Sequence, residues 1–255
     1  MNYLLVSVPL ALCLMVGMLF SLEFGRRLGR RRSTLSDSSN TGALDSAVFA
    51  LLGLLLAFTF SGAAARFDQR RAQAVEEAND IGTAWLRLDL LPPAQQPPLR
   101  DLFRRYVDAR LQMYQRLRSI EAQASDLSHS DAIQAEIWQR ATVACRERND
   151  PATTSLMLSS LNTMFDITTT RVAAGLMHPP VIVYGLLFVL ALASALVAGH
   201  SMASAKVAPW LHMVTFTTVI AASIFLVLDL EYPRAGVIRI DQIDQLLTNV
   251  RAGMR

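Results

Sequence analysis

The sequence is poor in the residues that build reactive or metal-binding sites. It holds two cysteines, Cys13 and Cys145, and four histidines, and none of these side chains lies at the spacing of a metal-ligand set. Cys13 lies in a long apolar stretch and Cys145 in a polar region, so a disulfide framework is excluded. Nucleophile elbows, phosphate-binding glycine loops and HExxH motifs are also absent. We therefore predict no cofactor, no metal site and no enzymatic activity.

Lysine is almost absent, and the positive charge is confined to one short segment. Lys206 stands alone against 23 arginines, and the formal net charge is +3. Residues 23–42 hold five arginines and two acidic residues, whereas residues 66–178 hold 14 of each sign and are neutral. Because the basic excess sits between two apolar stretches, it indicates a topology and lipid-headgroup signal, and we predict no nucleic-acid partner.

Four stretches contain no charged residue and are long enough to cross a bilayer. Each has 19 to 22 residues, which at about 1.5 Å of rise per residue spans a hydrocarbon core of roughly 30 Å. They are residues 3–22, 46–65, 181–199 and 207–228. Lipid offers no water to loose backbone groups, so each must be a helix. No basic residue precedes the first stretch, which we interpret as a retained helix and not a cleaved signal.

The region between the second and third stretches predicts a soluble helical insert. No proline interrupts the chain between Leu44 and Pro92, so one helix is expected from about Leu44 to about Leu91, half in lipid and half in water. Further helices follow. Ser128 with Asp131 predicts a capping box that starts one of them, and Asp150 predicts the N-cap of the next.

The sequence thus predicts an all-α membrane protein with four transmembrane helices and a soluble helical bundle inserted between the second and third. The predicted parts are residues 1–65, the first helix pair with its basic loop; 66–178, the insert; 179–230, the second pair; and 231–255, a C-terminal tail. The end of the tail, residues 241–255, has two alternatives, a short surface helix or a frayed end.

Two rows of side chains run along the second membrane helix at spacings of four. One is a ridge of small residues: Gly53, Ala57, Ser61 and Ala65. The other is a stripe of large apolar residues: Leu52, Leu56 and Phe60. Both rows could pack within one subunit, since small residues let helices approach closely in lipid. Alternatively the ridge packs between subunits, and the stripe forms a hydrophobic constriction, or neck, around a shared axis.

Charged residues follow directly where this helix leaves the apolar stretch. Arg66, Arg70 and Arg71 have two interpretations, as interfacial anchors or as rings at a pore mouth that would favour anions. An acidic patch comes next, with Glu76, Glu77 and Asp80. We interpret this patch first as a set of partners for arginines of the bundle.

Three stretches of the sequence resemble a known family. They are LLGLLLAFTFSGAAARFDQRRAQAVEEANDIGTAWLRLDLLP (51–92), LNTMFDITTTRVAAGLMHPP (161–180) and LDLEYPRAGVIRI (228–240). Together they resemble the bacterial bestrophin-like integral membrane family of uncharacterised function, with a more distant similarity to bestrophin channels. That similarity implies a pentameric anion channel whose neck is built by the second membrane helix. The sequence lacks the acidic cluster that a calcium clasp would need.

The resemblance implies the bacterial cytoplasmic (inner) membrane, but the side that carries the insert stays open. Arginines in the short first loop and Lys206 favour an external insert, whereas the resemblance and an unpaired Cys145 favour a cytoplasmic one. The predicted function is an oligomeric, bestrophin-like channel for small anions. The alternative is a non-conducting membrane scaffold or sensor whose insert binds a protein partner.

Overall fold

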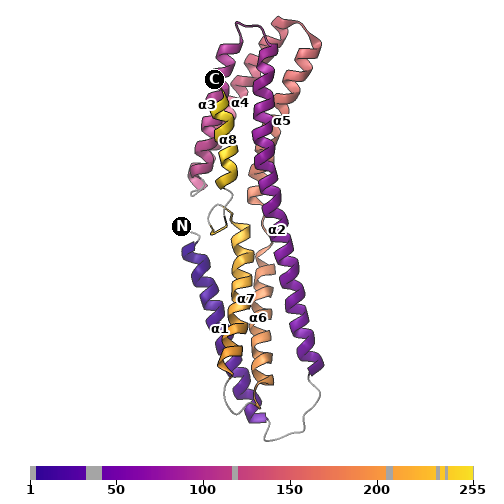
Figure 1. The fold of residues 1–255 in the computed structure, drawn as a ribbon, viewed down its shortest axis with the longest axis vertical. Helices are drawn as coiled ribbons and strands as arrows, with labels where there is room; N and C mark the ends of the chain where they lie inside the picture. The colour runs from indigo at the N-terminus through magenta and orange to yellow at the C-terminus, as the bar shows by residue number, and fades with distance from the viewer. Residues whose placement is uncertain are drawn as a thin grey trace. The chain divides into compact units, whose positions relative to one another are not determined.

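The computed structural model describes residues 4–32, 42–116, 120–204, 209–233, 236–238 and 241–254. Residues 33–41 of the predicted basic loop and Lys206 lie outside the described residues. Over the described ranges the chain forms helices joined by turns and contains no strand (Figure 1). Contacts divide it into two compact units. The transmembrane unit comprises Asn2–Arg66 and His178–Val237, and the insert unit comprises Phe67–Met177 and Ile238–Arg255.

The transmembrane unit contains α1 (Leu4–Arg32), the first part of α2 (Gly42–Arg87), α6 (Val181–Ser201) and α7 (Trp210–Glu231). Four helical stretches of the described chain are long and apolar enough to cross a membrane: Ser7–Arg31, Gly42–Leu90, Pro151–Ser201 and Trp210–Glu231. Each contains all or most of one of the four stretches predicted from the sequence. The prediction of an all-helical chain with four such helices is therefore confirmed.

Close backbone contact between α1 and α6 organises this unit. A Cβ atom added to Gly199 of α6 would lie 1.9 Å from the carbonyl oxygen of Leu22, and one added to Gly25 of α1 would lie 2.0 Å from that of Leu196. Glycine is therefore required at both positions, because any side chain would meet backbone atoms. Met18, Leu22, Leu187, Ala191 and Ala195 are completely covered in the core that these helices share.

Helix α2 is a single helix from Gly42 to Arg87, followed by the 3₁₀ turn η1 (Leu88–Leu90). The prediction of one uninterrupted helix, from about Leu44 to about Leu91, is confirmed. Its physical basis is the lack of proline, since no residue in the helix removes a backbone donor. The helical segment formed by α2 and η1 ends shortly before Pro92. The first part of α2 belongs to the transmembrane unit and the second part to the insert unit.

The insert unit contains the second part of α2, then η1, α3 (Gln96–Arg116), α4 (Ile120–Arg148), α5 (Pro151–Leu176) and α8 (Asp241–Gly253). Helix α3 contacts α4 and α8, and α4 contacts α5. The predicted capping box at Ser128 is wrong, because α4 is already helical from Ile120 and continues through Asp131. A capping residue needs non-helical backbone angles, and the favourable burial of residues such as Ile133 and Ile137 along α4 outweighs that local preference.

The predicted N-cap of α5 is confirmed. The Asp150 carboxylate accepts hydrogen bonds from the backbone N–H groups of Ala152 and Thr153, both at 3.2 Å, and Pro151 occupies the first turn. Asn149, just before it, has a φ of 51°, which turns the chain from α4 into α5. The Thr153 hydroxyl donates a further bond to Asp150, and these bonds lower the pKa of that carboxyl.

The end of the C-terminal tail is a helix, α8, which packs on α3 (Figure 1). Leu247 and Met254 are buried in the core of the insert unit. Arg251 donates two hydrogen bonds to the Asp108 carboxylate, at 2.7 and 3.0 Å, and Arg104 donates one to the carbonyl of Met254 at 3.0 Å. Of the two alternatives for this segment, the structure supports the helix.

Candidate functional site

The predicted ridge of small residues lies on the uncovered side of α2 within one chain. Gly53, Ala57, Ser61 and Ala65 are all exposed. A Cβ atom added to Gly53 would meet no atom within 4 Å. Two large apolar side chains flank the ridge, Leu54 at 53% and Phe58 at 68% exposure. Among the described elements of the same chain, none covers this face of α2.

The predicted neck row runs from the core of one chain to its surface. Leu52 is only 2% exposed and packs in the core of the transmembrane unit. Leu56 is partly buried against the same core, and Phe60 is 42% exposed. The spacing of four explains this change, because each step of four residues turns by about 40° around a helix with 3.6 residues per turn. Leu52 therefore packs within the chain, and Phe60 is the member of the row that is free to meet other molecules.

Arg66, in the middle of α2, is part of a cluster with Glu231 at the end of α7 and His178 just before α6. Its guanidinium donates to Oε1 of Glu231, with Nε at 2.9 Å, and the Glu231 side chain is completely buried. Nδ1 of His178 lies 3.5 Å from Oε2 of the same carboxylate. The His178 ring also stacks on Tyr232, with 4.7 Å between ring centroids. Arg66 of α2 therefore forms an ion pair with Glu231 of α7 in the same chain.

Arg70 and Arg71 have different surroundings although they are neighbours. Arg70 is buried, and it donates hydrogen bonds to the carbonyl groups of Ala174 at 3.1 Å and Met177 at 3.0 Å, which lie at the end of α5. A cation at a helix C-terminus is favourable because the carbonyl groups there lack partners. Arg71 is exposed, with Asp68 at 3.4 Å. Of the three predicted arginines, Arg71 alone keeps an exposed cationic group.

Glu77 lies at the centre of a buried ionic network in the insert unit. Nε of Arg110 donates to its Oε1 at 2.7 Å, and the Tyr114 hydroxyl donates to its Oε2 at 2.7 Å. Arg171 of α5 also donates to Oε2. The network therefore joins α2, α3 and α5. The prediction that the acidic patch pairs with arginines of the bundle is confirmed for Glu77, whereas Glu76 is exposed and Asp80 is partly buried.

Burial determines the protonation of the tyrosines in this region. Burial, with the adjacent Glu77 carboxylate as a second cause, raises the pKa of the Tyr114 hydroxyl well above its ordinary value. Tyr114 is therefore neutral and donates a proton to the hydrogen bond. Burial likewise raises the pKa of Tyr106, whose hydroxyl lies 2.9 Å from that of Thr168 and accepts from Gln134 at 3.2 Å. These bonds connect α3 with α4 and α5.

Sequence reasoning identified Glu77 but missed its partners. Arg110 and Tyr114 lie on α3 among the apolar positions that mark its buried faces, and Tyr106 precedes them by the same spacing of four. An arginine between apolar rows of a helix is a signal for a buried ion pair, because an unpaired charge there would be costly. The partner on α5, Arg171, has no comparable signal in the sequence.

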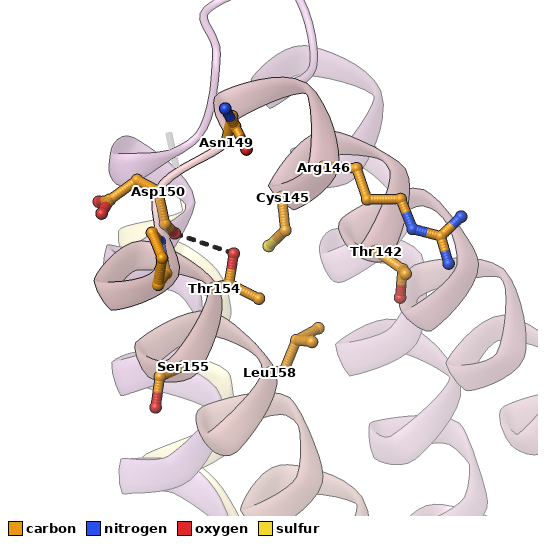
Figure 2. Close-up of a pocket in the computed structure, with 9 residues that line it drawn as sticks. Thr142, Cys145, Arg146, Asn149, Asp150, Thr154, Ser155 and Leu158 are labelled. Atoms are coloured by element: carbon orange, nitrogen blue, oxygen red, sulfur yellow. Dashed lines mark hydrogen bonds between the residues drawn. The ribbon is translucent and has the colours of Figure 1, made fainter.

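A pocket of about 510 Å³ lies at the turn between α4 and α5 (Figure 2). The Cys145 thiol and the Thr154 hydroxyl line it, and that hydroxyl donates to the backbone carbonyl of Asp150 at 2.9 Å. Cys145 is buried, and burial raises the pKa of its thiol. The thiol is therefore protonated near neutral pH and is a poor nucleophile. Among the described residues, no three side chains of His, Cys, Asp or Glu come together as a metal site.

The fold and these contacts define the class, an all-helical integral membrane protein with a helical insert unit. A bestrophin-like domain model matches residues 11–243, and the chain therefore belongs to the bestrophin-like family. A search of curated proteins gave no match.

Solved structures share the fold at low identity. A bestrophin homolog from Klebsiella pneumoniae, in a variant with one tyrosine changed to alanine, has 14% identity and a TM-score of 0.70, covering 94% of this chain and 98% of that one. The same homolog solved by Zn-SAD phasing has 15% identity and a TM-score of 0.65, with coverage of 94% and 98%. A structure described as a membrane protein, in a variant with one proline changed to alanine, has 16% identity and a TM-score of 0.66, with the same coverage.

Proposed function

We propose that this protein is an ion channel of the bacterial cytoplasmic membrane, formed by several copies that associate through α2. The observation that carries the proposal is the uncovered face of α2, where Gly53, Ala57, Ser61 and Ala65 are exposed in a single chain. In lipid, helices associate by close packing, and a ridge of small residues permits the closest approach. Membership of the bestrophin-like family supports the same proposal.

In this proposal the constriction of the pore comes from the exposed end of the neck row. Phe60 is 42% exposed, and Leu56 is partly exposed beside it. Rings of such side chains around an axis would close the path to hydrated ions, as hydrophobic constrictions do. Leu52 would support the constriction from within each subunit by holding α2 against its own core.

We propose small anions as the permeating ions, because arginines follow the constriction on α2. Arg66 and Arg70 are engaged within the chain, so Arg71 is the arginine that would present an exposed charge at the pore mouth. Rings of arginine favour anions. The number of copies is proposed as five from the family resemblance, and we propose no catalytic activity.

The alternative is a non-conducting scaffold or sensor whose insert unit binds another protein. The observation in its favour is apolar surface on α4, where Trp138 is 39% and Val143 is 51% exposed. Tryptophan is among the residues that are enriched at the centres of protein interfaces, and Trp138 would be the anchor of such a contact.

Anion flux from liposomes that contain the purified protein distinguishes the two functions. In a channel, Phe60→Ala removes the constriction and changes the flux. Phe20→Ala is the matched control, because Phe20 is a phenylalanine on α1 that is 73% exposed. The proposal requires that Phe60→Ala alters the flux by several-fold and that Phe20→Ala leaves it unchanged. An absence of flux in the wild type, with both variants folded, would favour the scaffold.

A further inference from the structure

Helix α1 continues for about three turns beyond Leu22, the last residue of its charge-free stretch. One side of this extension packs on the end of α6. Gly25 and Gly29 are both buried there, and a Cβ atom added to Gly29 would lie 2.9 Å from the carbonyl oxygen of His200. This side of α1 is therefore fixed against its own chain, and the opposite side is turned away from that contact.

The opposite side of the extension carries apolar and basic residues together. The residues of this mixed face are all exposed: Phe24, Arg27, Leu28 and Arg31. At about 100° per residue, the four positions fall within roughly 100° of the helix circumference, on the side away from the two glycines. The mixed face is thus one continuous surface on which a cationic and an apolar contact can be made at the same time.

The mixed face lies at the level of the lipid headgroups. Residues 3–22 account for roughly 30 Å of hydrocarbon, so the Cα atoms of Arg27 and Arg31 come about 8 and 14 Å further along the helix. The polar layer on each side of a bilayer is about 5–8 Å thick. Helical side chains lean toward the N-terminus, which at this end of α1 is the direction of the bilayer. Both guanidinium groups therefore reach back toward the phosphate layer.

The charge of this part of α1 is strongly positive, because residues 23–31 contain four arginines and one glutamate. Nε of Arg27 donates to Oε1 of Glu23 at 2.9 Å, and the Arg27 side chain is still 75% exposed. This contact orients the guanidinium and uses one of its five N–H donors. Arg27 and Arg31 are four residues apart, where two like charges repel each other, and an anion between them would remove that cost.

The other two arginines of residues 23–31 bind within the chain. Arg26 is buried and lies 3.4 Å from the carboxylate of Glu23, and Nε of Arg30 donates to the carbonyl of Ala203 at 3.4 Å. The arginines of this segment therefore divide into a pair that contacts the protein and a pair on the mixed face.

We propose that the mixed face binds an anionic phospholipid, with the phosphate on Arg27 and Arg31 and an acyl chain along Phe24 and Leu28. Charge complementarity selects an anionic headgroup. The apolar side chains add a contact that only a ligand with an acyl chain makes, so a lipid is favoured over free phosphate. The surface belongs to one chain, and the proposal does not depend on whether the protein conducts ions.

Native mass spectrometry of the full chain in detergent measures the binding, with phosphatidylglycerol as the anionic probe and phosphatidylcholine as the zwitterionic one. The wild type should bind phosphatidylglycerol more tightly. The double variant Arg27→Gln, Arg31→Gln should weaken that binding by about fivefold or more, because each arginine near an anionic surface contributes roughly a factor of five. Its affinity for phosphatidylcholine should be nearly unchanged.

The matched control is the double variant Arg140→Gln, Arg148→Gln. It removes two exposed arginines from α4, and Arg140 pairs with a glutamate four residues away, as Arg27 does. The control should bind both lipids as the wild type does. The double variant Arg27→Lys, Arg31→Lys keeps both charges and should retain most of the preference for phosphatidylglycerol. Inorganic phosphate, compared with sodium chloride at equal ionic strength, should displace little of the lipid.

Four results would overturn the proposal. The first is a wild type that binds both lipids equally well, and the second is a glutamine double variant that keeps the preference for phosphatidylglycerol. The third is displacement of the lipid by inorganic phosphate, which would assign the arginines to a free anion. The fourth is a smaller assembly in the glutamine double variant with an unchanged lipid preference, which would assign the mixed face to a second copy of the chain.

Discussion

Nε of Arg110 lies 2.7 Å from a carboxylate oxygen of Glu77, and neither side chain is exposed to solvent. Arg171 and Tyr114 complete the surroundings of this carboxylate. Three helices of the insert unit thus share one buried charge. A buried carboxylate between two guanidinium groups is tolerated only because every oxygen is paired, so the loss of one partner leaves uncompensated charge.

Glu77→Gln should therefore destabilise the protein strongly. We expect a loss of about 3–5 kcal/mol in the free energy of unfolding, because two buried arginines lose their anion. Chemical unfolding of the detergent-solubilised protein measures this loss. Glu136→Gln is the control, since Glu136 pairs with Arg140 at 3.2 Å on an exposed face, and its loss should be about 0.5 kcal/mol or less. Equal losses in the two variants would contradict a structural role for the network.

Gly199→Ala should destabilise the protein, because it disrupts the packing of α1 against α6. The added methyl group would lie 1.9 Å from a backbone oxygen of Leu22, and a backbone cannot move aside as a side chain can. Overpacking of this kind costs roughly 1–3 kcal/mol. Thermal unfolding in detergent is the measurement. Gly185→Ala, in the same helix but with no atom within 4 Å of the added carbon, should be neutral or slightly stabilising.

Ala57→Leu should weaken the association of subunits while leaving each subunit folded. Ala57 lies in the middle of the exposed small-residue ridge, where a larger side chain would push neighbouring helices apart. Size-exclusion chromatography with light scattering should show a smaller assembly than the wild type. Ala222→Leu on α7 is the matched control, as Ala222 is also exposed. A wild-type assembly with Ala57→Leu would place the subunit contact elsewhere.

Asp150→Ala should lower the unfolding midpoint because it removes the N-cap of α5. Asp150→Asn should keep most of the stability that the cap provides, since asparagine also caps helices. Hydrogen bonds from Thr153 lower the pKa of Asp150 in the folded state. The charge therefore stabilises the fold above the ordinary pKa of aspartate, about 3.9, and this stability is lost as pH falls through the folded-state pKa. The difference between wild type and Asp150→Asn should vanish in acid. A difference that grows in acid would contradict the assignment.

Local signals predicted the helices well. The proline-free run before Pro92 predicted the length of α2, and Asp150 with Pro151 predicted the start of α5. The capping signal at Ser128 failed because a side-chain cap is weaker than the burial that keeps α4 continuous. Propensities act over a few residues, and burial over a whole helix outweighs them.

Contacts between segments that are far apart in the chain could not be predicted from the sequence. Glu77 meets Arg171, which is 94 residues away, and no spacing rule relates residues on different helices. The neck row could not be placed from the sequence for the same reason. A spacing of four puts Leu52, Leu56 and Phe60 on a line that winds gradually around α2, and the spacing does not tell which of the three side chains faces the core. Single-sequence patterns define faces of helices, and the partners of those faces come from tertiary structure.

Helix α8 packs on α3, a helix that the ribosome completes more than 100 residues earlier, and Leu247 and Met254 fill part of the insert unit's core. During synthesis, therefore, the face of α3 that α8 covers stays without this partner until the last residues of the chain are made. A chain that stops before Asp241 would lack α8 and would leave that face of α3 without its partner.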